Sequence, residues 1–178
     1  MTAPSLDRYA VFGNPIEHSR SPQIHLQFAQ QTSEPISYTR QLVPKGEFNL
    51  HASAFFDRGG LGLNITAPFK LDAFRYADEL SNRAAAAGAV NTLISRDAKI
   101  VGDNTDGIGL VTDIISNLHW TLENQRILMV GAGGAARGVI APILAAKPQC
   151  LTIVNRTKHR AEELVALFES DADSNCCE

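Results

Sequence analysis

The sequence predicts an α/β fold made of two units, and three observations support this prediction. Short runs rich in β-branched and aromatic residues alternate with longer amphipathic runs, which is typical of strands that alternate with helices. Two later runs, residues 126–130 and 151–155, are almost wholly apolar, as expected of parallel strands buried on both faces. The loops rich in small polar residues also end near Asp106, and the almost wholly apolar runs come after it. We therefore expect one domain at residues 1–106 and a second at residues 107–178.

The first unit is expected to build a largely parallel sheet with helices between its strands. The expected strands are residues 8–13, 37–42, 61–65, 90–95 and 99–102, the last two forming a hairpin around Asp97. The expected helices are residues 21–32, 47–58, 68–77 and 79–87. Pro22 suits the first turn of its helix, in which Ile24 and Phe28 share one face. The residues expected to point inward from the second helix are Phe48, Ala52 and Phe55.

The second unit reads as a single β-α-β-α run. A helix at residues 107–118 leads out of the first unit, and the apolar strand 126–130 follows it. A glycine-rich turn then opens a helix at residues 135–145, followed by a strand at 151–155 and a last helix at 158–170. A polar tail begins at residue 170.

Composition and charge exclude several classes of protein. The chain has 178 residues, 44% of them hydrophobic and 20% charged, with a formal net charge of -3. A nucleic-acid binder needs a clustered basic surface and a membrane span needs about 18 consecutive apolar residues, and the sequence shows neither. Its start lacks the apolar core of a signal peptide. Cys150, Cys176 and Cys177 fit neither a zinc site nor a disulfide framework, so we expect a cytoplasmic protein without a bound metal.

The glycine-rich turn has the spacing of a dinucleotide-binding motif. Gly131, Gly133 and Ala136 satisfy the pattern G-x-G-x-x-G/A directly after a strand and at the start of a helix. The first glycine permits a tight turn, the second lets the backbone approach a pyrophosphate, and the small third residue lets helix and strand pack closely. Such turns also occur for packing alone, so the strand–turn–helix context is what favours binding. The residues expected to hold the pyrophosphate are Gly131, Ala132, Gly133, Gly134 and Ala135.

The end of the next strand indicates which dinucleotide binds. NAD sites usually carry an Asp or Glu there, which accepts hydrogen bonds from the ribose hydroxyls. This chain has Asn155, Arg156 and Thr157 instead, followed by Lys158 and Arg160. A guanidinium can bind a 2′-phosphate with two hydrogen bonds, whereas a carboxylate would repel it. The sequence therefore predicts NADP(H) as the cofactor, the alternative being a basic start to a surface helix.

Small polar residues gather in the loops that follow the strands of the first unit. They lie in residues 13–22, 64–70, 91–92 and 103–107. In open α/β sheets ligands sit at the carboxyl ends of strands, so these hydroxyls and amides suit a ligand rich in hydroxyl groups. Each segment alone reads equally well as a turn or a helix cap. Four such segments together favour a binding site for a ligand rich in hydroxyl groups.

Six ordered segments carry a family resemblance. They are FGNPIEHSRSPQIH, GLNITAPFK, GAVNT, GDNTDG, GAGGAARG and NRTKHRAEEL, and they extend to about residue 168. These segments resemble the shikimate dehydrogenase family and occur in its order. The resemblance implies a substrate domain followed by the first half of a Rossmann-type NADP-binding domain. It also implies NADPH-dependent reduction of 3-dehydroshikimate to shikimate, in the pathway to chorismate and the aromatic amino acids.

The same resemblance implies a role for each polar segment. It assigns the substrate carboxylate to Ser19 and Ser21. The residues that it assigns to ring hydroxyls are Asn64, Thr66, Asn91 and Asp106. It makes Lys70 and Asp106 the catalytic pair and places Lys70 among the substrate contacts. His18 and His25 are expected to be a loop residue and a helix-face residue rather than catalysts.

The chemistry of ketone reduction suits that pair. Hydride addition generates an alkoxide, so a positioned cation such as Lys70 stabilises the developing charge and delivers a proton. Asp106 can orient the ammonium and accept a hydrogen bond from a substrate hydroxyl. The alternative for Lys70 is a solvated lysine at a helix start, which is the unfavourable end for a cation. The alternative for Asp106 is a helix N-cap, a common use of Asp.

Other interpretations stay open at this stage. One is a quinate/shikimate dehydrogenase that uses NAD, and another is a related dehydrogenase of the amino-acid or folate type. A dinucleotide fold is built from two mononucleotide halves, and only the first is recognisable here. We therefore expect the sequence to be a C-terminally truncated member, for which a non-catalytic binding remnant is a third interpretation. A homodimer is left open as the assembly, with shikimate or 3-dehydroshikimate as the small-molecule partner and with no nucleic-acid or membrane partner.

Overall fold

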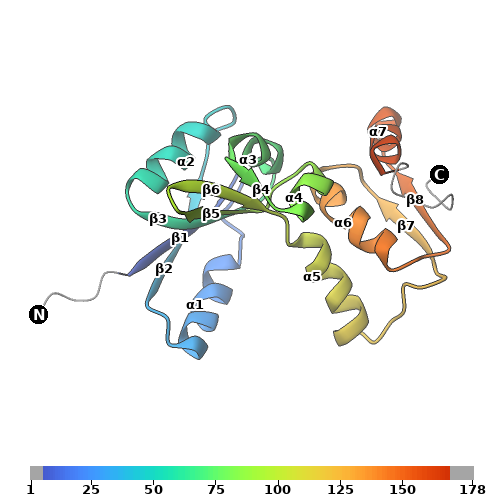
Figure 1. Ribbon diagram of the computed structural model, residues 1–178, viewed down its shortest axis with the longest axis horizontal. Coiled ribbons are helices and arrows are strands. Elements are labelled where there is room, and N and C mark those ends of the chain that lie inside the picture. The colour runs from blue at the N-terminus through green and yellow to red at the C-terminus, as the bar shows by residue number, and fades with distance from the viewer. Residues whose placement is uncertain (1–5, 169–178) are drawn as a thin grey trace, which may run out of the picture. The chain divides into compact units, whose positions relative to one another are not determined.

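The computed structural model describes residues 6–168 (Figure 1). Its chain divides into two compact units. The first comprises Met1–Ala84 and Val90–Asp103, and the second comprises Ala85–Ala89 and Asn104–Glu178. The predicted α/β fold is confirmed. The polar tail, with Cys176 and Cys177, lies outside the described residues. The role expected for each unit stays a prediction.

A mixed six-stranded sheet forms the centre of the first unit. Its strands are β1 (Asp7–Gly13), β2 (Ile36–Leu42), β3 (Gly60–Ile65), β4 (Glu79–Leu80), β5 (Thr92–Arg96) and β6 (Lys99–Asp103). They lie in the order β2-β1-β3-β5-β6-β4. β1 runs parallel to β2 and β3, whereas β5 is antiparallel to β3 and β6. The predicted hairpin is confirmed, and Asp97 and Ala98 at its turn have φ of 51° and 61°.

Helices cover both faces of this sheet (Figure 1). They are α1 (Ser21–Thr32), α2 (Phe48–Asp57), α3 (Lys70–Tyr76) and α4 (Asn82–Ala87). The helix expected at residues 79–87 starts too early, because Glu79 and Leu80 pair with β6 as β4. α4 begins only after Ser81, whose Oγ accepts a hydrogen bond from the Ala84 amide at 3.1 Å. α3 likewise begins at Lys70, two residues later than residue 68.

The main core of the first unit lies between the sheet and α2 and α3. Phe48, Ala52 and Phe55 are buried, as predicted, and the Phe12 ring makes edge contacts with both phenylalanines. α1 differs, because Ala29 is its buried residue while Ile24 and Phe28 are 44% and 54% exposed. Ile24 and Phe28 are therefore only partly covered by residues 6–168, although the Phe28 ring makes an edge contact with His25.

The second unit has the predicted β-α-β-α order. Its elements are α5 (Asp106–Thr112), a π-helical continuation (Asp113–Asn117), β7 (Arg126–Val130), α6 (Gly134–Ala145), β8 (Cys150–Val154) and α7 (Lys158–Phe168). β7 and β8 are parallel and in register from Arg126 with Cys150 to Val130 with Val154. Asn155 follows β8 rather than ending it. The end expected for the last helix at residue 170 lies outside the described residues.

One face of this small sheet departs from the prediction of strands buried on both sides. Ile127 and Met129 pack against a cluster that includes Ile140 and Leu164 of α6 and α7. Leu128 and Val130 point to the other face, where they are 64% and 81% exposed. Successive side chains of a strand alternate between faces, and within residues 6–168 helices cover only one of them. The prediction of a strand at residues 126–130 is therefore confirmed, whereas the prediction that it is buried on both faces is wrong within this unit.

Candidate active site

The polar segments of the first unit meet at one edge of its sheet. The backbone amide of Asn14, after β1, donates to the carbonyl of Ala67 at 3.0 Å, and that of Thr66 donates to Phe12 at 2.9 Å. The amide of Ile65 donates to the carbonyl of Asn91 at 2.7 Å. The structure thus brings together the predicted loops after β1 and β3 and the segment before β5. This is the carboxyl edge of the parallel pair β1 and β3, where ligands bind in open sheets.

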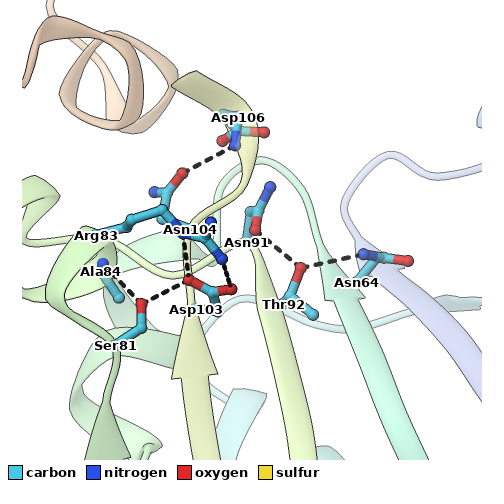
Figure 2. Close-up of polar contacts among 9 residues, drawn as sticks. All are labelled: Asn64, Ser81, Arg83, Ala84, Asn91, Thr92, Asp103, Asn104 and Asp106. Atoms are coloured by element: carbon cyan, nitrogen blue, oxygen red, sulfur yellow. Dashed lines mark hydrogen bonds and ion pairs between the residues drawn. The ribbon is translucent and has the colours of Figure 1, made fainter. Parts of the chain in front are cut away.

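A chain of side-chain hydrogen bonds runs along this edge. The Asn64 Nδ2 donates to Thr92 Oγ1 at 3.4 Å, and Thr92 Oγ1 donates to Asn91 Oδ1 at 2.9 Å (Figure 2). On its other side Asn64 Oδ1 accepts a hydrogen bond of 2.6 Å from the Tyr38 hydroxyl. Asn91 is almost fully buried, and Asn64 and Thr92 are half-buried. These bonds fix which way each amide faces, so the polar groups are arranged before any ligand arrives.

Ser19 and Ser21 lie side by side at the start of α1. Ser19 Oγ donates to Ser21 Oγ at 3.1 Å, and the Ser21 amide donates to Ser19 Oγ at 3.3 Å. Arg40 of β2 holds this loop in place, since its Nε donates to the Ser19 carbonyl at 2.7 Å. The same guanidinium reaches Gln23 in the first turn of α1 at 3.1 Å. Two hydroxyls and a helix amino terminus therefore converge, which suits an anion such as a carboxylate.

The two predicted catalytic residues each begin a helix, in different units. Lys70 is the first residue of α3 and half-buried, and its carbonyl accepts from the Val90 amide at 3.0 Å. Asp106 is the first residue of α5 and half-buried, and its amide donates to Asn104 Oδ1 at 3.2 Å (Figure 2). The N-cap of α5 is Thr105, so the reading of Asp106 as the cap is wrong by one residue. A carboxylate in a first helical turn is favourable, whereas a lysine there is not.

The glycine-rich turn joins β7 to α6, as predicted. Gly131 has φ of +116°, a backbone conformation that favours glycine, and its amide donates to the Val154 carbonyl at 2.7 Å. Gly133 is the N-cap of α6, and a Cβ at Gly131 or Gly133 would meet no atom within 4 Å. Ala136 is buried where α6 packs on the strands. Ala132, Gly134 and Ala135 complete the turn and the first residues of the helix.

The basic segment after β8 faces the solvent. Arg156, Lys158 and Arg160 are exposed. Asn155 Nδ2 donates to the Thr157 carbonyl at 2.8 Å, which closes the turn before α7. Lys158 Nζ lies 3.0 Å from Glu162 Oε1, so part of its charge is already compensated. Among residues 6–168 no group of three His, Cys, Asp or Glu could hold a metal ion. In the same range, no helix is both long and apolar enough to cross a membrane.

Two family models match this sequence. One is described as the shikimate dehydrogenase substrate binding domain and matches residues 11–93. The other is described as shikimate / quinate 5-dehydrogenase and matches residues 113–176. The chain belongs to the shikimate dehydrogenase family. The resemblance carried by the six segments is thereby confirmed.

Similar proteins of this family are found among curated sequences and solved structures. "Shikimate dehydrogenase (NADP(+))" of Chromobacterium violaceum is 58% identical over 162 residues, which cover 91% of this chain and 59% of that protein. The protein of the same name from Saccharophagus degradans is 54% identical, over 93% of this chain and 60% of that protein. The Aquifex aeolicus shikimate dehydrogenase structure has a TM-score of 0.88 at 30% identity, over 95% of this chain and 63% of that one.

A second solved structure was determined with ligands bound. It is the shikimate 5-dehydrogenase of Thermus thermophilus in complex with NADP(H) and shikimate. Its TM-score is 0.84 at 30% identity, and the match covers 92% of this chain and 61% of that chain. The 178-residue chain spans about 60% of the length of the curated relatives that it matches.

Tyr38 of the present chain also lies at the polar edge that contains Asn64, although the sequence did not single it out. Its side chain is buried, and its ring stacks on His25 with centroids 4.3 Å apart and planes 8° apart. Burial raises the pKa of Tyr38 to about 12, although a hydrogen bond with Ser21 opposes this shift. Tyr38 therefore lies between Ser21 on one side and Asn64 on the other. Burial also lowers the pKa of His25, which favours a neutral ring.

Tyr38, Asn64 and Thr92 also line a cavity of about 510 Å³ between α1 and the sheet. Its other walls include Tyr9, His25 and Phe28. No local pattern in the run ISYTRQL distinguishes Tyr38 from a half-buried strand tyrosine. Its partners come from α1 and β3, so only the pairing of β1 with both β2 and β3 reveals them.

Proposed function

We propose that this protein catalyses the reversible NADPH-dependent reduction of 3-dehydroshikimate to shikimate, a step toward chorismate and the aromatic amino acids. The observation that carries the proposal is the joined polar edge of the first unit, where the Ser19–Ser21 pair and the Asn64–Thr92–Asn91 chain are prearranged. Two relatives of 54% and 58% identity bear the name shikimate dehydrogenase (NADP(+)), which supports the same reaction. The Thermus thermophilus structure with NADP(H) and shikimate supports it as well.

In this proposal Ser19 and Ser21 bind the substrate carboxylate. Each hydroxyl can rotate to donate to a carboxylate oxygen, and the start of α1 adds a favourable dipole. Arg40 holds the Ser19 carbonyl and keeps the loop in place without needing to touch the ligand. The residues that bind the ring hydroxyls are Asn64, Thr66, Asn91 and Asp106. Amides suit hydroxyls because each amide offers both a donor and an acceptor.

Lys70 and Asp106 act on the reacting carbonyl and the hydroxyl beside it. As hydride adds to the carbonyl carbon, the π electron pair moves to oxygen, and Lys70 Nζ stabilises this charge and gives up a proton to it. In the oxidation of shikimate the same nitrogen, now neutral, takes the hydroxyl proton back. Asp106 accepts a hydrogen bond from the neighbouring hydroxyl.

The residues of the second unit fit NADP(H). When bound, NADPH supplies the hydride for the reaction. Gly131 and Gly133 leave open space where a Cβ would stand, and the amino end of α6 offers amide donors to the pyrophosphate. The exposed Arg156 is suited to the 2′-phosphate, with Asn155 and Thr157 in the turn before it and Lys158 and Arg160 behind it. This donor set lacks the carboxylate that NAD sites use for the ribose.

The cellular setting follows from the same proposal. We place the protein in the cytoplasm, where cysteines such as Cys150 stay reduced. A homodimer is the assembly to test, by size-exclusion chromatography with light scattering at several protein concentrations. A mass that stays at one chain across the whole range would rule it out.

An activity assay with the full-length protein tests the reaction directly. NADPH oxidation should depend on 3-dehydroshikimate, and NADP reduction should depend on shikimate. Quinate in place of shikimate, and NAD in place of NADP, distinguish the quinate/shikimate dehydrogenase that the second family model also names. Equal or better turnover with quinate and NAD would replace the proposed reaction with that one. Absence of turnover in every arm would contradict the proposed reaction.

A further inference from the structure

Asn104 is a buried polar residue to which the proposed chemistry gives no role. It follows β6 and stands two residues before Asp106, at the entrance to α5. Its side chain is only 2% exposed, although asparagine is usually found on the surface. Such burial calls for hydrogen-bond partners, and those partners identify what the residue does.

The side-chain amide of Asn104 joins two backbone segments of the second unit. Its Oδ1 accepts a hydrogen bond of 3.2 Å from the amide of Asp106 (Figure 2). Its Nδ2 donates to the carbonyl of Ala89 at 2.9 Å. The first bond alone would be an ordinary Asx turn. The second bond goes further, because it ties the start of α5 to the Ala85–Ala89 segment fifteen residues earlier in the chain.

The same amide lies against the middle of α6. A Cβ placed on Gly138 would stand 2.8 Å from Asn104 Oδ1 and 2.9 Å from its Nδ2. Glycine at position 138 is therefore what lets the amide approach the helix backbone. The neighbouring contact is equally close, since a Cβ on Gly107 would collide with the Gly138 carbonyl and with Pro142. α5 thus starts in direct backbone contact with the helix whose amino end carries the glycine-rich turn.

We propose that Asn104 is a positioning residue that sets where Asp106 stands relative to the cofactor turn at the start of α6. This inference rests on the proposed function, because it gives Asp106 and the Gly131–Gly133 turn their roles. Asn104 holds the Asp106 backbone on one side and packs on Gly138 of α6 on the other. A shift of the Asn104 amide therefore displaces Asp106 relative to α6. Displacements of about 1 Å can lower a rate about 100-fold.

The chemistry of the amide explains why asparagine stands here. It supplies one acceptor for the Asp106 amide and one donor for the Ala89 carbonyl. An ionised aspartate would accept only, and its oxygen would face the Ala89 carbonyl oxygen in a buried place. A protonated carboxyl, in contrast, has both a donor and an acceptor and could restore both bonds.

A double-mutant cycle between Asn104 and Gly138 tests the contact in the full-length protein. Asn104→Ala should lower kcat about 10- to 100-fold by misplacing Asp106, with NADP affinity from calorimetry little changed. Gly138→Ala should lower kcat in the same direction, because its methyl group pushes the amide away. Adding Gly138→Ala to Asn104→Ala should cause little further loss. Gly109→Ala in α5 is the matched control, since a Cβ there meets no atom within 4 Å.

The pH dependence of Asn104→Asp separates positioning from a general loss of structure. Its kcat relative to wild type should be lowest where the new carboxyl is ionised and should recover as the pH falls, because the protonated group donates to Ala89 again. A variant that only weakened the fold would show a lower melting temperature and a ratio that does not recover on acidification.

Two outcomes overturn the inference while leaving the proposed function intact. One is an active wild type with unchanged kcat in Asn104→Ala and Gly138→Ala. The other is a pair of losses that multiply fully in the double mutant, which would show two independent effects. A wild type without turnover would instead contradict the proposed function. The double-mutant cycle would then be measured through the melting temperatures of the four proteins. Non-additive changes in melting temperature would still show that the Asn104 amide packs on Gly138, and additive changes would show that it does not.

Discussion

The Tyr38 hydroxyl donates a hydrogen bond of 2.6 Å to Asn64 Oδ1, and this bond links β2 to the polar edge of the site. Because Asn64 Oδ1 is occupied by Tyr38, the Nδ2 of the same amide is turned toward Thr92. The hydrogen bond with Ser21 gives Tyr38 a second neighbour in the carboxylate loop. Tyr38 therefore connects the two groups of residues proposed to bind opposite parts of one substrate.

We expect Tyr38→Phe to raise KM for 3-dehydroshikimate about 2- to 12-fold, because a neutral hydrogen bond contributes about 0.5–1.5 kcal/mol. The ring stacked on His25 remains, so kcat and the melting temperature should change little. The change in KM should be the same from pH 6 to about 9, because the pKa of Tyr38 is raised to about 12 and the hydroxyl stays protonated throughout.

Tyr76→Phe is the matched control for this change. Its hydroxyl pairs with Ser53 at 3.1 Å in an exposed place, so its loss should leave KM unaltered. In a cycle with Asn64→Ala, the Tyr38→Phe effect should largely disappear, because the bond then has no acceptor. Fully additive losses would show that Tyr38 does not act through Asn64.

Lys70→Ala should lower kcat by about 10²–10⁴-fold, the usual cost of losing a general acid, with a smaller change in KM. Steady-state kinetics in both directions measure this. The melting temperature should not fall much, because a lysine in the first turn of α3 opposes the helix dipole. Lys99→Ala removes an exposed lysine that pairs with Glu79 and should leave kcat at the wild-type value. A Lys70→Ala enzyme with wild-type kcat and only a raised KM would make Lys70 a binding residue.

Ser19→Ala and Ser21→Ala should each raise KM for the acid about 10- to 100-fold, since a hydrogen bond to a charged group is worth about 1.5–3 kcal/mol. An analogue without the carboxylate should lose much less affinity in the same variants. Ser53→Ala, whose hydroxyl faces Tyr76, serves as the control. Equal losses for the acid and the analogue would mean that this loop does not hold the carboxylate.

The parts of the candidate site that the sequence could predict are those whose residues lie close together in the chain. Gly131 and Gly133 follow a strand and open a helix at fixed spacing, and the Ser19–Ser21 loop follows the first strand directly. Tyr38 and Asn104 were not predicted as site residues, because their partners lie 26 and 15 residues away and depend on strand register and helix crossing. The exposed Leu128 and Val130 are a similar case, since an apolar run cannot tell which of its faces is covered.

The same limit applies to β4. Glu79 and Leu80 continue a helical pattern in the sequence, and only their pairing with Val101 and Gly102 makes them a strand. Tertiary pairing overrides local preference in such short elements. The adjacent helix start could have been placed, because Ser81 is a residue that commonly caps helices.

Arg156→Ala should weaken NADP binding about 10- to 100-fold and leave NAD binding nearly unchanged, because the proposed contact is a charge-assisted hydrogen bond to the 2′-phosphate worth about 1.5–3 kcal/mol. Lys158→Ala should have a smaller effect, since Glu162 already lies 3.0 Å from that ammonium. Arg126→Ala, an exposed arginine at the start of β7, is the matched control and should alter neither affinity. Calorimetric titration of each variant with NADP and with NAD provides the comparison. If Arg156→Ala weakened both dinucleotides equally, the guanidinium would contact a part that they share, such as the pyrophosphate, and the basis for NADP preference would have to be sought in another residue.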